Sequence, residues 1–122
     1  MTAVDWVALT LLGGGGALLR YAVDGAIERR SRSAFPLGTL AINVSGAFAL
    51  GVLTGAHAGS EVLFVFGTGL IGSFTTFSTW MFETQRRYEG VVTRSVAAWN
   101  VALTLAAGLA AAGAGWWLAA SL

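Results

Sequence analysis

The sequence contains no cysteine, one proline, one histidine and few charged residues. Without cysteine, the chain has no disulfides, no thiolate chemistry and no cysteine metal site. Charged residues make up 11% of the 122 positions and hydrophobic residues 56%, whereas an ordinary soluble domain has about 25% charged residues. This composition predicts a membrane protein. The formal net charge of +1 adds nothing to that conclusion.

The shortage of reactive side chains argues against an enzyme and against a side-chain metal site. His57 lies in a short hydrophilic segment and has no second ligand at a metal-binding spacing, so we expect a solvated loop residue. All carboxylates except that of Asp24 fall at or beyond the ends of the hydrophobic runs, which leaves no pair for acid–base catalysis. We expect neither an enzyme nor a nucleic-acid partner.

Hydrophobic runs of the length that crosses a bilayer, about 20 residues, occur four times. They cover residues 6–27, 35–56, 62–82 and 95–120. The hydrophilic segments between them are too short to fold alone, so residues 1–122 are predicted to form one all-α domain of four transmembrane helices. The first run lacks the positively charged start of a signal peptide, and we interpret it as a helix of the mature protein.

The predicted spans are rich in small residues, with 17 glycines in the chain. Gly51 and Gly55 form a GxxxG pair, a spacing that allows two helix backbones to approach closely in lipid. Four helices enclose little space for a polar pathway. We therefore expect the chain to dimerise.

Two polar features of the first two spans each have two interpretations. Arg20 and Asp24 are one helical turn apart, so they form either a local ion pair or part of an aqueous vestibule in which Arg20 attracts anions. Asn43 lies well inside the second run, where its amide must find partners. It serves either as an interhelical hydrogen-bonding residue or as the lining of a pore.

The third span carries a concentration of hydroxyl groups in the segment GLIGSFTTFSTW, which begins at Gly69. Back-bonding to helix carbonyls does not require four hydroxyls in five positions. The segment predicts a helix broken near its middle, with free carbonyls that can hold a cation. Amide and hydroxyl donors and the positive edges of aromatic rings suit a small anion better than a cation. The four hydroxyl residues are Thr75, Thr76, Ser78 and Thr79.

The segments GGGGALLRY, PLGTLAINVSGAF and GSFTTFSTW together resemble the signature of the CrcB/Fluc family of fluoride channels. They cover three of the four spans in family order and spacing. The resemblance implies an antiparallel, dual-topology-type dimer in the plasma membrane of a prokaryote, which passively exports fluoride and relieves its toxicity. Fluoride enters as uncharged hydrogen fluoride and is trapped as the ion at cytoplasmic pH, so a passive exit suffices.

The resemblance also implies roles for residues of the matched motifs. Asn43 would be the pore amide, and Phe77 and Trp80 would be the two pore aromatics. The family usually has Phe where this chain has Trp80, and we expect the larger indole, with its N–H donor, to narrow the path or to hold fluoride longer. The remaining implied pore residues are the hydroxyl-bearing Thr76, Ser78 and Thr79.

Other implied sites lie beside the pore. Backbone carbonyls of Gly72 and Thr75 from both subunits would hold a structural sodium ion that is not transported. Arg20 would lie near the pore entrance. On the fourth span, Asn100 and Thr104 share a helix face and are weaker candidates for a polar track.

Two other classes of function are compatible with a short four-helix chain. A small proton-coupled multidrug exporter needs a membrane-embedded carboxylate, and Asp24 is the one candidate. The other alternative is a tetraspan subunit without transport activity.

The arginines other than Arg20 predict the orientation of the chain. They fall in the first and third loops, which lie on one side of a four-span protein, and the positive-inside rule places that side in the cytoplasm and both termini outside. So strong a bias favours a fixed orientation, with a paralogous chain of opposite orientation as the physiological partner. The arginines are Arg29, Arg30, Arg32, Arg86, Arg87 and Arg94.

Overall fold

The computed structural model describes all 122 residues, and every regular element in it is helical. The first, second and fourth spans are the single helices α1 (Ala3–Arg30), α2 (Leu37–Gly55) and α6 (Arg94–Ala120). The third span joins four shorter elements, which are α3 (Ser60–Val62), η1 (Leu63–Ile71), α4 (Gly72–Phe74) and α5 (Ser78–Glu89). All four spans are long and apolar enough to cross a membrane, which confirms the predicted all-α, multi-pass class.

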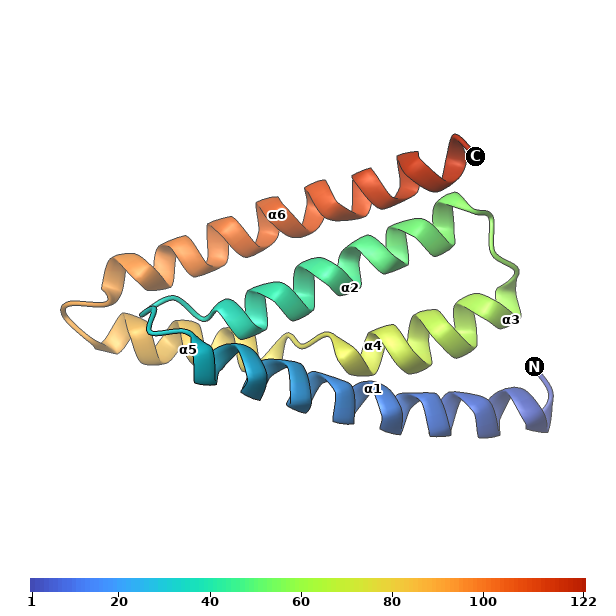
Figure 1. Cartoon of the computed structure of the whole chain (residues 1–122), viewed down its shortest axis with the longest axis horizontal. Coiled ribbons are helices and arrows are strands. Elements are labelled where there is room, and N and C mark those ends of the chain that lie inside the picture. The colour runs from blue at the N-terminus through green and yellow to red at the C-terminus, as the bar shows by residue number, and fades with distance from the viewer.

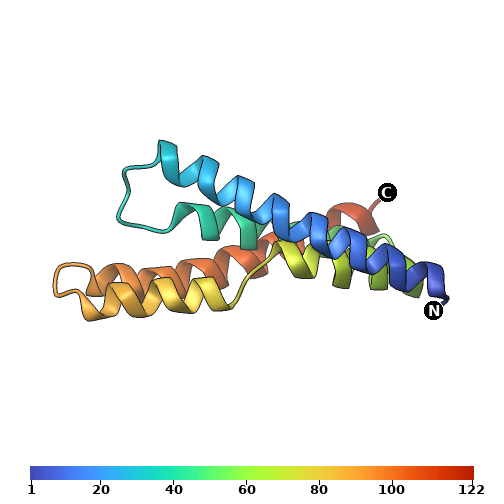
Figure 2. The ribbon, with the colours of Figure 1, turned by 90° about the horizontal axis from the view of Figure 1, so that it is seen from below.

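The four spans run back and forth along one axis (Figure 1). Both termini and the loop between α2 and α3 lie at one end of the molecule, and the α1–α2 and α5–α6 loops lie at the other. The most extensive pairing is between α2 and α6. Helix α1 packs along η1 and α4, and α5 packs on α6. Figure 2 shows the C-terminal half of α1 diverging from the α5–α6 hairpin, while the N-terminal half lies beside η1. The arginine-bearing first and third loops therefore share one end, as expected.

Two helices extend beyond the predicted hydrophobic runs. At the start of α1, the side chain of Thr2 accepts from the amide of Asp5, and the Asp5 carboxylate accepts from the amide of Thr2, which begins the helix at Ala3. The third span continues as helix to Glu89, although residues 83–94 were expected to form a loop. The residues between Glu83 and Glu89 include good helix formers, so the helix continues after the hydrophobic run ends.

Glycines of α2 and α6 hold these two helices in close contact. A Cβ added at Gly51 would overlap the backbone carbonyl of Ala112, and one at Gly55 would overlap that of Trp116. From the opposite side, a Cβ at Gly115 would overlap the carbonyl of Phe48. This geometry confirms the close helix approach predicted from the GxxxG spacing.

The third span is irregular at two places. Residues 63–71 form a π-helix, whose turns are wider than those of an α-helix. Helical geometry then stops at Thr75, which has an extended backbone with φ −76° and ψ 161°, and resumes in α5 at Ser78. The span as a whole bends by 22°. Residues 75–77 therefore lie between two helical segments at the level where α1 and α2 pass the third span.

Candidate functional site

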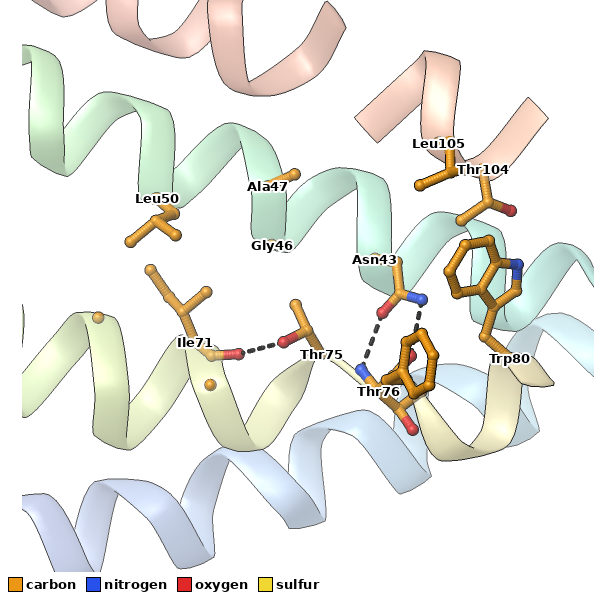
Figure 3. Close-up of a pocket in the computed structure, with 13 residues that line it drawn as sticks. Asn43, Gly46, Ala47, Leu50, Ile71, Thr75, Thr76, Trp80, Thr104 and Leu105 are labelled. Atoms are coloured by element: carbon orange, nitrogen blue, oxygen red, sulfur yellow. Dashed lines mark hydrogen bonds between the residues drawn. The ribbon is translucent and has the colours of Figure 1, made fainter. Parts of the chain in front are cut away.

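A reciprocal pair of hydrogen bonds joins α2 to the interruption of the third span. Asn43 Nδ2 donates to the Thr76 carbonyl over 2.9 Å, and the Thr76 amide donates to Asn43 Oδ1 over 2.8 Å. Figure 3 shows the two bonds between these residues at the wall of an open groove. The amide of Asn43 thus supplies the partners that Thr76 would otherwise find within a continuous helix. One N–H of the Asn43 side chain has no hydrogen-bond partner within the chain.

Side-chain oxygens accept hydrogen bonds from two backbone amides that would otherwise continue the helix across the interruption. The Thr76 amide binds Asn43, and the Thr79 amide donates to Thr76 Oγ1 over 3.2 Å. In an α-helix these two amides would bond to the carbonyls of Gly72 and Thr75. Neither bond is formed, and the Thr75 carbonyl instead accepts from Arg20 Nη1 over 3.3 Å. The two carbonyls therefore keep acceptor capacity in the middle of the bundle.

The four hydroxyls of this segment have different environments. Only Thr75 bonds back to its own helix, with Oγ1 donating to the Ile71 carbonyl over 3.0 Å. Thr76 Oγ1 donates to Thr79 Oγ1 over 3.0 Å, which leaves the Thr79 hydroxyl proton free to donate. Ser78 is exposed on the surface of the chain and makes no side-chain hydrogen bond. The sequence predicts more hydroxyls in this segment than back-bonding to the helix requires. The structure agrees, because only one of the four bonds back to its own helix.

The two aromatic residues of the site meet edge to face. The rings of Phe77 and Trp80 have centroids 5.8 Å apart and planes at 80°. Phe77 is 70% exposed, whereas Trp80 is 7% exposed and packs into the chain. Trp80 Nε1 donates to the backbone carbonyl of Asn100 over 3.2 Å. This indole donor therefore already has a partner within the chain, which favours the expectation that Trp80 narrows the path over the expectation that its N–H holds fluoride.

A polar network links α5 to α6 behind Trp80. The side chain of Asn100 is completely buried, and its Nδ2 donates to Thr84 Oγ1 over 2.8 Å. Thr104 Oγ1 donates to Asn100 Oδ1 over 3.4 Å. Sequence reasoning paired Asn100 with Thr104 but missed Thr84, which lies one helical turn after Trp80 and so faces α6 with it.

Two hollows flank the interruption, and Thr76 lines both. The larger is an open groove of about 380 Å³ between α2, the third span and α6 (Figure 3). The smaller, of about 200 Å³, lies between α1, α2 and the third span and is lined by Arg20, Asp24 and Thr79. Ser78 and Asn100 line neither hollow. The predicted site residues that line the groove are Asn43, Gly72, Thr75, Thr76, Phe77, Trp80 and Thr104.

Three buried polar atoms lack hydrogen-bond partners, and two of them belong to Asp24 and Thr39, which line the smaller hollow. Asp24 Oδ1, Thr39 Oγ1 and Glu83 Oε2 are buried and make no hydrogen bond within the chain. Arg20 donates to the Thr75 carbonyl rather than to Asp24, so the local ion pair, one of the two interpretations of these residues, does not form and a contact between helices takes its place. Neither Thr39 nor Glu83 was selected from the sequence. Thr39 lies within the segment PLGTLAINVSGAF but was assigned no role, Glu83 lies outside the matched segments, and the surroundings of both depend on packing.

No group of three or more histidine, aspartate or glutamate side chains in the chain could hold a metal ion. Backbone carbonyls are also suitable ligands for hard cations.

Comparison with known proteins finds a family model and relatives that match the chain along nearly its whole length. Residues 7–116 match the family model described as CrcB-like protein, Camphor Resistance (CrcB). The chain is 47% identical over 111 residues to a fluoride-specific ion channel FluC 2 of Mycolicibacterium paratuberculosis, a match covering 91% of this chain and 90% of that protein. It is 42% identical to a fluoride-specific ion channel FluC 1 of Streptomyces avermitilis, with 98% of both chains covered. A FluC 2 protein of Haloarcula marismortui is 43% identical, with 95% of both chains covered.

Proposed function

We propose that this chain, which belongs to the CrcB-like protein family, is a fluoride-selective channel that passively exports fluoride and lowers its cytoplasmic concentration and toxicity. Relatives that align along nearly its whole length carry the name fluoride-specific ion channel. The observation that carries the proposal is the groove beside the interrupted span, where an amide, hydroxyls and an aromatic edge gather without a fixed charge. Such weak donors allow an anion to bind and still leave.

The groove and the smaller hollow offer donors that the chain itself does not use. Asn43 has one free N–H at the groove, and the hydroxyl proton of Thr79 has no acceptor at the smaller hollow. Ser78 lines neither hollow, but its exposed hydroxyl has no partner within the chain. Phe77 projects from the chain, and its ring edge carries a partial positive charge. Thr76 lines both hollows, so an ion passing between them would move along this residue. These residues form the fluoride path in our proposal, with Arg20 attracting the anion at one mouth.

We infer that two antiparallel copies, or this chain and a paralogue of opposite orientation, form the conducting unit. The groove is open on one side and holds polar groups, and polar groups facing lipid carry a large free-energy cost. A second subunit over the groove would remove Phe77 and the donors from lipid. It would also convert an open groove into a closed path.

We further propose that the interruption is a functional helix break that holds a structural sodium ion. The carbonyls of Gly72 and Thr75 lack helical amide partners, which makes them suitable ligands. Two carbonyls do not complete a coordination shell, so the same pair from a second subunit would be required. The Arg20 bond to Thr75 occupies one lone pair of that oxygen and leaves the other for the ion.

The proposed orientation places the α1–α2 and α5–α6 loops in the cytoplasm. All arginines except Arg20 lie at that end of the molecule, and the opposite end has none. Fluoride leaving the cell would then meet the Arg20 side of the third span first.

Fluoride efflux from liposomes, followed with a fluoride electrode, tests the proposed function. We expect efflux that requires the protein and is not accompanied by chloride. In cells that lack their own fluoride exporter, the chain should restore growth in fluoride. Rescue from organic cations without fluoride efflux would instead support the multidrug-exporter alternative, and rescue from neither would support a non-transporting subunit.

A further inference from the structure

The end of the molecule that carries the first and third loops has a concentration of positive charge outside the fluoride path. Six arginines lie there, whereas the other end holds Asp5, Glu61 and no arginine. The six are Arg29, Arg30, Arg32, Arg86, Arg87 and Arg94. Charge alone does not define a binding site, but two of these arginines also line a hollow.

The hollow has a volume of about 290 Å³ and joins the α1–α2 loop to the α5–α6 hairpin. It is lined by Ala34, Arg86, Arg87 and Thr93. Arg87 is held in place, because its Nε donates to the Ala34 carbonyl over 2.8 Å and its Nη1 donates to the Glu83 carbonyl over 3.2 Å. Its Nη2 has no partner within the chain. The hollow thus has one positioned guanidinium with a free donor.

Arg86 supplies a second guanidinium, which makes no hydrogen bond within the chain. It lies 5.7 Å from the ring centroid of Phe82, a side chain that is 61% exposed. Phe82 ends the third hydrophobic run, so the ring belongs at the edge of the hydrocarbon layer. Arg86 is therefore positioned at the depth of the lipid phosphates.

We propose that the hollow between Ala34, Arg86, Arg87 and Thr93 binds the phosphodiester headgroup of an anionic phospholipid. Guanidinium groups bind phosphate oxygens through charge-assisted hydrogen bonds, and two of them converge here. The surrounding arginines favour a lipid with net negative charge over a zwitterionic one. A bound headgroup would fasten the first loop to the α5–α6 hairpin through Arg87. The proposal is independent of fluoride conduction.

Native mass spectrometry of the purified full-length protein, with added dioleoyl-phosphatidylglycerol or dioleoyl-phosphatidylcholine, tests the site. We expect the protein to retain phosphatidylglycerol in preference to phosphatidylcholine. The double variant R86Q/R87Q should lose roughly tenfold or more of this affinity. The double variant R29Q/R30Q removes the same charge at the same end but outside the hollow, and it should retain most of the binding.

The single variant Arg86→Gln keeps the test valid if loss of Arg87 disturbs the fold, because the Arg86 guanidinium makes no hydrogen bond within the chain. We expect this variant to weaken phosphatidylglycerol binding while thermal stability is unchanged. Equal retention of the two lipids, or equal loss in R29Q/R30Q and R86Q/R87Q, would overturn the proposal. So would displacement of the lipid by millimolar inorganic phosphate, which would identify free phosphate as the ligand.

Discussion

Asn43 on α2 and Thr76 in the third span exchange two hydrogen bonds, of 2.8 and 2.9 Å, through one side-chain amide and one peptide unit. This relationship combines two roles that the sequence presents as alternatives. The amide holds two spans together, and it also lines the groove in which we propose that fluoride moves. A substitution at Asn43 should therefore affect both stability and conduction.

Asn43→Asp removes the donor to the Thr76 carbonyl, retains the acceptor for the Thr76 amide, and places a carboxylate in the groove. We expect fluoride efflux from liposomes to be abolished, because a carboxylate repels the anion. The lost bond should cost about 1–3 kcal/mol of stability, while the dimer still elutes intact from gel filtration. Ser45→Ala, an exposed position on the same helix, is the control. Full efflux in Asn43→Asp would remove Asn43 from the path.

Phe77 and Trp80 should separate conduction from stability. Phe77→Ile should severely reduce efflux while it changes the stability of the subunit fold by no more than about 0.5 kcal/mol, because the ring is mostly exposed on the single chain. Trp80→Phe should maintain or raise efflux but destabilise the protein by about 1–3 kcal/mol, since the bond from the indole N–H to the Asn100 carbonyl and part of the buried ring volume are lost. Efflux and thermal unfolding of both variants would be compared. An unchanged rate in Phe77→Ile would exclude this ring from the path.

The proposed conducting unit should require sodium. Substitutions of the side chains beside the sodium site should have little effect on fluoride efflux. The ligands we propose are the carbonyls of Gly72 and Thr75, so substitution of their side chains is a weak test. We expect purification with N-methylglucamine in place of sodium to reduce fluoride efflux, and we expect sodium to restore it. Potassium at the same concentration serves as the ionic-strength control. Full activity in thoroughly sodium-free buffer would contradict the site.

Gly51→Ala should weaken the packing of α2 on α6. The added methyl group would overlap the Ala112 carbonyl, so the helices would have to separate, at a cost of about 1–3 kcal/mol. A lower midpoint of thermal unfolding in detergent would report this loss. Gly113→Ala on α6 is the matched control, because a Cβ there meets nothing within 4 Å. If both variants unfolded at the same temperature, close packing at Gly51 would not contribute measurably to the stability of the protein.

A cysteine at Gly59 should report the orientation of the chain. Gly59 is exposed in the loop between α2 and α3, and a Cβ there meets nothing within 4 Å. In intact cells, we expect Gly59→Cys to react with a membrane-impermeant maleimide from outside only. The natural chain has no cysteine, so it provides an unreactive background. Equal labelling from the two sides would demonstrate dual insertion and refute a fixed orientation.

Those parts of the structure that depend on local patterns could be predicted from the sequence. Hydrophobic runs of bilayer length identified the four spans, and the Gly51 and Gly55 spacing identified a close helix contact. The helical continuation to Glu89 was missed, because loss of hydrophobicity does not by itself end a helix. The π-helix of residues 63–71 was also missed, since its hydrogen-bond pattern has no distinct sequence signal.

The candidate site was predictable as a set of residues but not as a set of contacts. The motifs selected Asn43, Thr76 and Trp80, and all three line one groove. Two contacts follow only from how the helices pack. The Trp80 N–H donates to the Asn100 carbonyl, and Arg20 donates to the Thr75 carbonyl. Such pairings join positions far apart in the chain, and a single sequence carries no record of which distant groups meet.

The interruption at residues 75–77 is supported by a side chain on another helix, and this affects how the protein can be built. Asn43 provides the partners for the Thr76 peptide unit. Before α2 is beside it, the third span can enter the bilayer as an uninterrupted helix that satisfies all its own amides, the form that lipid favours. The interruption can then arise when the second span replaces those internal bonds, so that insertion and formation of the site become separate steps of biogenesis.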